Sequence, residues 1–334
     1  MISRIGLISF AHMHAFSYAE ALQQLPERAH IAGVYDDDAL RGQDACRQLG
    51  VRFFERIEDL LAESDGVIVC SENAKHKDHV IQAAEAKKPI LCEKPISISM
   101  ADAQAMIDAS DGAQAPLMIA FPCRYSTPAF RVRQILEQEK LGNIMALKGT
   151  NRGTMPGGWF VDPALSGGGA VIDHTVHVID LWRWLLQRDV TSVYAEIEQR
   201  FYPELPVEDS GLLSLEFEGG IFATLDTSWS RPSQSFPTWG DVTLEIIGDL
   251  GTITLDAFNQ KIEIYNNDAV KSEWAYWGDD LNLGLIKAFL KIVEAPETPP
   301  ITGHDGLKAV EVALAAYRSR DEGAQVSLPL SLND

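Results

Sequence analysis

Residues 5–16 read IGLISFAHMHAF, an apolar strand pattern that runs directly into a predicted turn and helix. A strand, a tight turn and a helix in this order open the βαβ units that bind dinucleotides. Those units usually carry a G-x-G-x-x-G pattern, but here Ser9, Ala11 and His14 occupy the three glycine positions. The stretch predicts a dinucleotide-type fold and leaves open which groups would hold the phosphates.

The same rhythm of strand and helix continues over residues 2–120. Strands that are too apolar to alternate, joined by helices, indicate a parallel sheet covered on both faces. We therefore expect a doubly wound α/β Rossmann domain over residues 1–121. The expected strands are IGLIS, IAGVYD, VRFF, GVIVC, PILC and PLMIA, and the expected helices span 14–25, 38–49, 57–63, 77–87 and 99–110.

Beyond residue 121 the pattern changes to long successive strands. Turn sequences such as EGG at 218–220 and GDLG at 248–251 connect them, which indicates a mainly antiparallel open sheet. We expect an α+β domain over residues 122–334. Its expected helices span 127–139, 170–187, 280–294 and 304–320, and its expected strands span 144–152, 190–201, 208–218, 220–229, 242–247, 251–256, 260–265 and 325–328.

Composition and charge restrict the class of partner. The 334 residues include 28 basic and 48 acidic side chains, a formal charge of -20 that repels nucleic-acid backbones and anionic lipids. No apolar segment approaches the roughly 18 residues of a membrane span, and we expect no signal sequence because the apolar run before Phe10 is too short for one. The four cysteines lie far apart, as free thiols in a reducing compartment would. We expect a cytoplasmic protein with no nucleic-acid or membrane partner.

The opening turn can bind phosphate without glycine. Backbone N–H groups and the helix N-terminus supply the attraction, and neither requires glycine if the turn avoids positive φ angles. We expect Ser9, Phe10, Ala11 and the N–H groups of His12 and Met13 to face the phosphates.

Asp36 ends the next expected strand about twenty residues after the turn, where an acidic residue takes the ribose 2′-OH of NAD. A carboxylate there disfavours the 2′-phosphate of NADP, so we expect NAD rather than NADP. The alternative is that Asp36, Asp37 and Asp38 only begin and cap the following helix. His14 is far bulkier than glycine, and we expect it to push the helix outward or to lie at its rim.

The segment LCEKPIS at 91–97 places a lysine directly after a buried parallel strand. Ligands bind at the carboxyl ends of such strands, and Pro95 favours an extended exit for Lys94. A partly desolvated lysine can exchange protons with an alcohol near neutral pH. The alternative is a solvated surface lysine.

The segment SGGGAVIDHTVHVIDLWRWLL at 166–186 combines a glycine-rich loop with an apolar helix that carries polar side chains. Asp173 and His177, four residues apart, share one face of that helix, and Asp180 extends the polar stripe. Such groups are costly to bury unless they meet a ligand or each other. The alternative is that Asp173 and His177 are hydrogen-bonded within the core and have no catalytic role.

Together, the EKP lysine and the G-G-G-x-x-x-D-x-x-x-H helix resemble those of the Gfo/Idh/MocA family, named after glucose-fructose oxidoreductase and inositol dehydrogenase. CSENAKH at 70–76 resembles the family's T-P-N-x-x-H loop, with Asn73 and His76 matching, and residues 301–328 resemble its C-terminal helix and strand. The glycine pattern departs from the family's. The histidine usual in the first helix is replaced by Ser17, or is displaced to the turn.

This resemblance implies an NAD(P)-dependent dehydrogenase that acts on a hydroxyl of a sugar, inositol or related polyol. It also implies that the domain over residues 1–121 binds NAD(P) and that the domain over residues 122–334 binds substrate and mediates oligomerisation. Lys94 would bind the nicotinamide ribose and the substrate hydroxyl, His177 would transfer the proton, and Asp173 would orient the substrate. The residues expected to bind cofactor are Ser9, Phe10, Ala11, His12, Met13, Asp36, Ser71, Asn73, His76, Glu93, Lys94 and Arg124. Those expected to bind substrate are Lys94, Arg152, Trp159, Phe160, Asp173, His174 and His177.

Three alternatives remain open. His12 and His14, together with Asp173, His174 and His177, could bind zinc or another divalent ion, although the family's chemistry needs no metal and we expect none. Some relatives use NAD as a redox catalyst for glycoside cleavage, and others have become ligand sensors. Relatives also pair their second domains, so we expect a homodimer or homotetramer through the C-terminal sheet.

Overall fold

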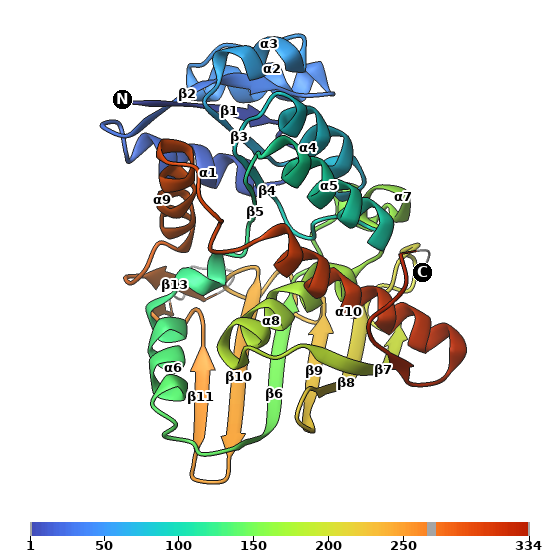
Figure 1. Cartoon of the computed structure of the whole chain (residues 1–334). Coiled ribbons are helices and arrows are strands. Elements are labelled where there is room, and N and C mark those ends of the chain that lie inside the picture. Colours follow the sequence, from blue (N-terminus) through green and yellow to red (C-terminus); the bar gives the residue numbers. More distant parts are fainter. Residues whose placement is uncertain (1, 266–271, 333–334) are drawn as a thin grey trace. The chain divides into compact units, whose positions relative to one another are not determined.

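The computed structural model describes residues 2–265 and 272–332, which fold into two compact units. The first unit contains residues 2–122 and 281–307, and the second contains the described parts of 123–280 and 308–332. Residues 281–307, which the sequence analysis groups with the second domain, therefore pack in the first unit. Figure 1 shows them in orange to red.

The first unit is built on a five-stranded sheet with the order β2-β1-β3-β4-β5. Every neighbouring pair is parallel, which confirms the doubly wound sheet. Side chains of the inner strands are buried because helices cover both faces. The strands are β1 (Ser3–Ile8), β2 (Ala29–Tyr35), β3 (Gly66–Val69), β4 (Ile90–Cys92) and β5 (Leu117–Ile119).

Helices on each face follow from right-handed crossovers, which place α1 on one face and α3, α4 and α5 on the other. Helix α9 lies beside α1 (Figure 1). The helices of this unit are α1 (His14–Gln23), α2 (Ala39–Leu49), α3 (Ile57–Glu63), α4 (His76–Glu85), α5 (Met100–Ala113) and α9 (Leu281–Glu294), with a short 3-10 turn η1 (Asn73–Lys75).

The strand expected at VRFF is wrong. Phe53 forms only an isolated bridge to Val34. The N–H of Val34 donates to Arg52 O, and the N–H of Phe54 donates to Val34 O, before the chain bends into α3. The segment passes the edge of β2 over too short a length to form a strand.

The second unit contains a seven-stranded sheet with the order β11-β10-β6-β9-β8-β7-β14. Its pairs are antiparallel except β6 with β9, so the sheet is mixed but mainly antiparallel, as expected. The strands are β6 (Ile144–Gly153), β7 (Val190–Glu198), β8 (Ser210–Phe217), β9 (Ile221–Ser228), β10 (Gly240–Gly248), β11 (Thr252–Asp256) and β14 (Val326–Ser327). A separate two-stranded antiparallel sheet pairs β12 (Lys261–Ile264) with β13 (Glu273–Tyr276), a strand that the sequence did not predict.

One face of this sheet is covered by α8 (Ala170–Leu186), which packs on its central strands. Burial alternates along β7, β8 and β9 because the opposite face is exposed. Gly149 lets α8 approach β6, since a Cβ atom there would lie 2.7 Å from the Trp182 ring. The other elements of the unit are η2 (Pro122–Tyr125), α6 (Thr127–Glu137), η3 (Gly158–Val161), α7 (Pro163–Ser166) and α10 (Gly303–Glu322), whose first turn belongs to the first unit.

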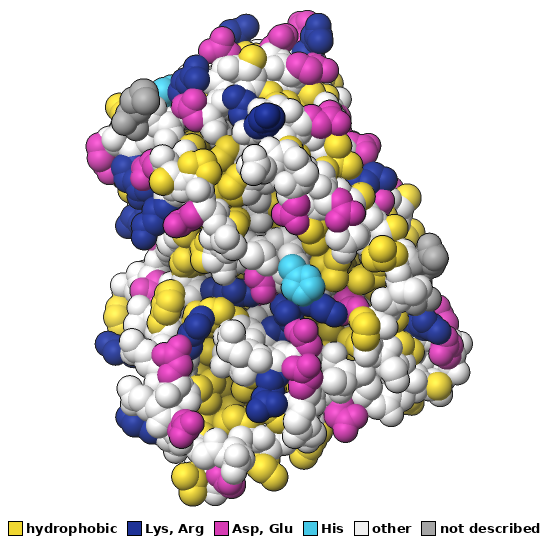
Figure 2. Space-filling view, in the orientation of Figure 1, with side chains coloured by type: hydrophobic (Ala, Val, Ile, Leu, Met, Phe, Trp, Pro, Cys, Tyr) yellow, Lys and Arg dark blue, Asp and Glu magenta, His cyan; other side chains and the backbone are white. Residues whose placement is uncertain are grey.

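Lys and Arg side chains are interspersed with Asp and Glu on the face drawn in Figure 2. Across the described ranges, none of the helices is both long and apolar enough to pass through a lipid bilayer. All four cysteines are buried and free of disulfide bonds.

We expect Gly149→Ala to destabilise the second unit by about 1–3 kcal/mol, because the new methyl group would overlap the Trp182 ring and a Val178 methyl group. Urea unfolding followed by circular dichroism measures the change. Gly112→Ala is the control, since α5 leaves open space there and the substitution should stabilise the helix by up to about 1 kcal/mol. Equal or greater stability of Gly149→Ala would contradict the packing described.

Candidate functional site

The turn after β1 adopts the conformation that glycine usually provides. Ser9 has a φ of 68°, so the condition under which the turn would not require glycine, avoidance of positive φ, is not met at this residue. The Ser9 hydroxyl accepts a hydrogen bond from the Ala11 N–H at 3.2 Å. The side chain thus stabilises a turn that its own backbone conformation disfavours.

Three backbone N–H groups of this turn, those of Phe10, Ala11 and His12, already have protein acceptors. The N–H of Phe10 donates to Asp36 Oδ2 at 2.8 Å, and the N–H of His12 donates to the carbonyl of Cys70 at 2.9 Å. The His12 N–H, which the sequence analysis assigned to phosphate, is therefore used to join the turn to the end of β3.

Asp36 lies buried at the carboxyl end of β2, as expected, but its carboxylate is paired with Arg41. Arg41 donates from Nε to Oδ2 at 2.9 Å and from a terminal nitrogen to Oδ1 at 2.6 Å. The same guanidinium contacts Glu72 and the Ser9 hydroxyl. Asp38, rather than Asp36, caps α2 through the N–H groups of Leu40 and Arg41.

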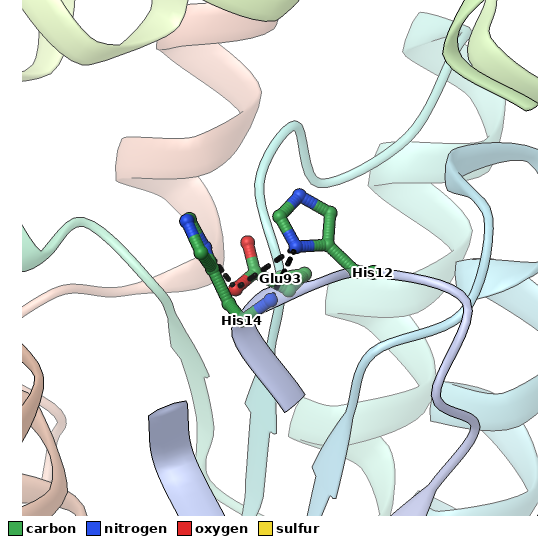
Figure 3. Close-up of side chains that lie close together, drawn as sticks. All are labelled: His12, His14 and Glu93. Carbon is green, nitrogen blue, oxygen red and sulfur yellow. Dashed lines mark hydrogen bonds and ion pairs between the residues drawn. The ribbon is translucent and has the colours of Figure 1, made fainter. Parts of the chain in front are cut away.

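Glu93 from the EKP motif is the centre of a buried cluster (Figure 3). Its Oε1 lies 2.9 Å from His14 Nδ1 and 4.0 Å from His12 Nδ1. The hydroxyl of Tyr18 donates to the same oxygen at 2.5 Å, and the N–H of Lys94 donates to Oε2 at 3.0 Å. His14 begins α1 with its side chain about a third exposed, so it lies at the rim of the helix, and its ring faces inward toward Glu93.

The electrostatics of the cluster keep Glu93 ionised. Burial alone would raise the pKa of its carboxyl, but the imidazoles of His12 and His14 and the charge of Lys94 hold that pKa well below its usual range. Burial and the Glu93 carboxylate raise the pKa of Tyr18, which therefore stays a hydroxyl donor at neutral pH.

The expected cofactor loop at 70–76 is held against the EKP segment by a histidine. His76 is fully buried, with Nδ1 3.0 Å from Pro95 O and Nε2 3.1 Å from Ser71 O. Burial lowers the pKa of His76, so the ring is neutral and donates to one of the two carbonyls. Ser71 and Asn73 are also buried, and the Ser71 hydroxyl lies 3.0 Å from His79 Nδ1.

In the second unit, α8 carries the other predicted catalytic side chains. His174 and His177 are buried, and His174 Nε2 lies 3.3 Å from the Asp173 carboxylate. Asp180 forms a buried two-point ion pair with Arg124, at 2.8 and 2.5 Å. Arg124, predicted to bind cofactor, therefore satisfies the polar stripe of α8 within its own unit.

Substrate residues predicted from the loops also lie in this unit. The rings of Trp159 and Phe160 are stacked with centroids 4.0 Å apart. Arg152 shares the Asp241 carboxylate with Arg231, a partner that the sequence analysis did not identify. Burial would raise the pKa of Asp241, but Arg231, Thr150 and Arg152 lower it.

Glu208 and Tyr317 hold the N-terminus of α8, and no sequence motif marked either residue. Glu208 Oε1 accepts hydrogen bonds from the N–H groups of Gly169 and Val171 at 2.9 and 3.0 Å and from the Tyr317 hydroxyl at 2.7 Å. Burial raises the pKa of the Glu208 carboxyl, although these hydrogen bonds act in the opposite direction. The carboxylate caps a helix whose own N-cap residue, Gly169, has no side chain to do so.

Comparison with known proteins adds two family matches and several full-length relatives. Residues 4–121 match the model of the oxidoreductase family with an NAD-binding Rossmann fold, and residues 130–254 match the GFO/IDH/MocA C-terminal domain. Myo-inositol 2-dehydrogenase of Thermotoga maritima is 27% identical over 97% of this chain and 98% of that protein. Inositol 2-dehydrogenase of Rhizobium meliloti is 27% identical over 87% of this chain and 88% of its own length.

Solved structures agree over the whole chain. The crystal structure of GenD2 from gentamicin A biosynthesis, in complex with NAD, is 25% identical, with a TM-score of 0.88 over 98% of this chain and 97% of that one. A putative myo-inositol dehydrogenase from Sinorhizobium meliloti 1021, also 25% identical, has a TM-score of 0.82 and covers 98% of this chain and 100% of its own.

We expect Glu208→Gln to make stability less dependent on pH. A carboxyl whose pKa is raised on folding stays protonated in the folded protein while the unfolded chain ionises near pH ~4.3, so its contribution to stability is lost as the pH rises. Glutamine keeps the Oε1 acceptor and cannot ionise. The melting temperature of Glu208→Gln minus that of the wild type should therefore increase from about pH 4 to pH 8.

Thermal melts across that pH range, with the exposed Glu204→Gln as the control, test this expectation. A difference between Glu208→Gln and wild type that is constant with pH would show that the buried carboxyl does not titrate as described.

Proposed function

The chain belongs to the GFO/IDH/MocA family of oxidoreductases with an NAD-binding Rossmann fold, and on this premise we propose that it oxidises a hydroxyl of a sugar, inositol or related polyol. Two of its near-full-length relatives are named as inositol 2-dehydrogenases. The observation that carries the proposal is Lys94, a buried amine directly after the carboxyl end of β4 in the NAD-binding unit. Ligands of open α/β sheets bind at that edge.

The proposed roles follow from the chemistry of alcohol oxidation. NAD accepts the hydride, so the chain's own residues must orient the hydroxyl and remove its proton. Lys94 and His177 serve as the proton-transfer residues, and Asp173 orients the substrate. The Asp173 carboxylate lies 3.3 Å from His174 Nε2, so the two side chains form a polar pair on α8.

We assign cofactor binding to the turn after β1, to Asp36 and to the 70–76 loop. A carboxylate at Asp36 suits a ribose 2′-OH, in keeping with NAD. Arg41 occupies both oxygens of that carboxylate, so ribose binding would require the guanidinium to share or leave them. The cytoplasm suits the four free, buried thiols.

The substrate side would use the Trp159 and Phe160 stack with Arg152 and His174. Flat apolar rings can pack against the C–H face of a sugar or inositol ring, while the guanidinium and imidazole can bind its hydroxyls. These groups and α8 belong to the same unit of the chain.

We also propose that the exposed face of the second sheet pairs with a second copy. Leu212 on β8 and Phe222 on β9 are 63% and 62% exposed, and they lie on the face that α8 does not cover. Large apolar side chains on an open sheet face suit a symmetric interface in a homodimer or homotetramer.

The test of the dehydrogenase activity is a screen of inositols and sugars with NAD and NADP, following absorbance of the reduced nicotinamide. We expect Lys94→Ala and His177→Ala each to lower kcat/KM by at least about 100-fold, because each removes a proton-transfer group. Lys140→Ala and His304→Ala, both exposed, are the matched controls. Product release from glycosides without net NADH would favour the redox-lyase alternative, and NAD binding without turnover would favour a sensor.

For the oligomer, the double variant Leu212→Lys/Phe222→Lys should be smaller in solution than the wild type, since two buried charges disfavour an apolar interface. Light scattering after size-exclusion chromatography measures the mass. Leu40→Lys, which changes a 76% exposed leucine in the other unit, should leave it unchanged. A monomeric wild type would contradict the interface.

A further inference from the structure

We propose that His12, His14 and Glu93 form a binding site for one divalent transition-metal ion, most suitably Zn²⁺. One donor atom of each residue lies within 4.8 Å of the other two (Figure 3). The proposed dehydrogenase reaction needs no metal, so this site goes beyond it. The sequence alone suggested His12 and His14 as metal ligands only together with Asp173, His174 and His177; in the structure Glu93 is the residue that lies beside them.

The spacing of the donors suits a single ion. Tetrahedral ligands about 2.0–2.1 Å from zinc lie about 3.3 Å apart. His14 Nδ1 and His12 Nδ1 lie 2.9 and 4.0 Å from Glu93 Oε1, values on either side of that spacing. Small side-chain rotations would therefore bring all three donors to bonding distance. Two imidazoles and one carboxylate leave further coordination positions for water or a ligand, as in catalytic zinc sites.

The elements that carry these residues bring them together locally. His12 lies in the turn after β1, His14 is the first residue of α1, and Glu93 directly follows β4, a strand near β1 in the same sheet. The two rings lie side by side, with centroids 4.4 Å apart. All three ligands therefore belong to one unit, and the site needs nothing from the other.

The surroundings of Glu93 match the outer shell of a metal ligand. Tyr18 donates to the carboxylate oxygen that faces the histidines, and the Lys94 N–H donates to the other oxygen. Such hydrogen bonds fix the orientation of a ligating carboxylate. The carboxylate is also fully buried, and a bound cation compensates a buried negative charge.

The hydrogen-bonding state of the rings indicates how the ion would enter. His12 Nδ1 lies 3.2 Å from the backbone N–H of His14 and accepts from it, so this nitrogen carries a lone pair. His14 Nδ1 lies in hydrogen-bond contact with Glu93 and holds the proton between them. Binding of M²⁺ at His14 Nδ1 would move that proton to Nε2 of the same ring, so that the metal forms one bond to each residue, both rings stay neutral imidazoles and the metal keeps its oxidation state. Nitrogen donors favour zinc, cobalt or nickel over magnesium.

The experiment uses the full chain, freed of metal with a chelator, and Zn²⁺ alone as the probe. Isothermal titration should give one Zn²⁺ per chain. Titration with Co²⁺ should give visible ligand-field absorption, and Mg²⁺ should not compete.

Substitutions identify the site. His14→Ala and Glu93→Gln should each weaken Zn²⁺ binding at least about tenfold, since each removes a ligand. His30→Ala, at an exposed histidine of β2, is the matched control and should bind as the wild type does. Glu93→Gln changes a buried group, so circular dichroism checks its fold. His14 is partly exposed, so its variant tests the site independently.

The absence of stoichiometric Zn²⁺ binding, or equal affinity in wild type and both variants, would overturn the proposal. NAD binding and dehydrogenase activity of the metal-free protein are measured separately. If these persist while Zn²⁺ fails to bind, the metal site is wrong and the proposed function stands. If Zn²⁺ binds as expected while no polyol reduces NAD, the metal site stands and the proposed function is wrong.

Discussion

The Glu93 carboxylate lies fully buried at the end of β4, and side chains at the carboxyl edge of the first sheet are arranged around it. An uncompensated charge in such a position costs several kcal/mol, so the chain must bring hydrogen-bond donors to it. Tyr18 from α1, His14 from the start of the same helix and the Lys94 N–H all do so. One side chain thereby fixes how α1 meets the sheet and how the chain leaves β4 toward the lysine.

In the second unit, buried polar groups along α8 are compensated in a similar way. A helix made mainly of Val, Ile, Leu and Trp carries Asp180 in its buried face, and Arg124 neutralises it with two hydrogen bonds. The helix N-terminus is satisfied by Glu208 from a distant loop. Since both ends of the polar stripe are held in this way, Asp173 and His177 occupy defined positions on the same helix.

The sequence predicted features that depend on local pattern. Apolar strands joined by helices predicted the parallel sheet, and D-x-x-x-H predicted side chains on one helix face, because both periods follow from backbone geometry. It did not predict the positive φ of Ser9, the return of residues 281–307 to the first unit, or the parallel pairing of β6 with β9. These depend on contacts between residues far apart in the chain, as does the meeting of Glu93 with two histidines about 80 positions earlier, which no local rule encodes.

Loss of the glycines changes the chemistry of the opening turn. In a glycine-rich turn the backbone N–H groups point at the phosphates, and no side chain intervenes. Here the N–H groups of Phe10, Ala11 and His12 donate to Asp36, Ser9 and Cys70, so the turn is held together by the protein itself. Serine tolerates positive φ only with such support, and histidine at the third position replaces close helix packing with a polar contact to Glu93. Attraction for an anion at this turn must therefore come more from side chains, or from a bound cation, than from backbone N–H groups.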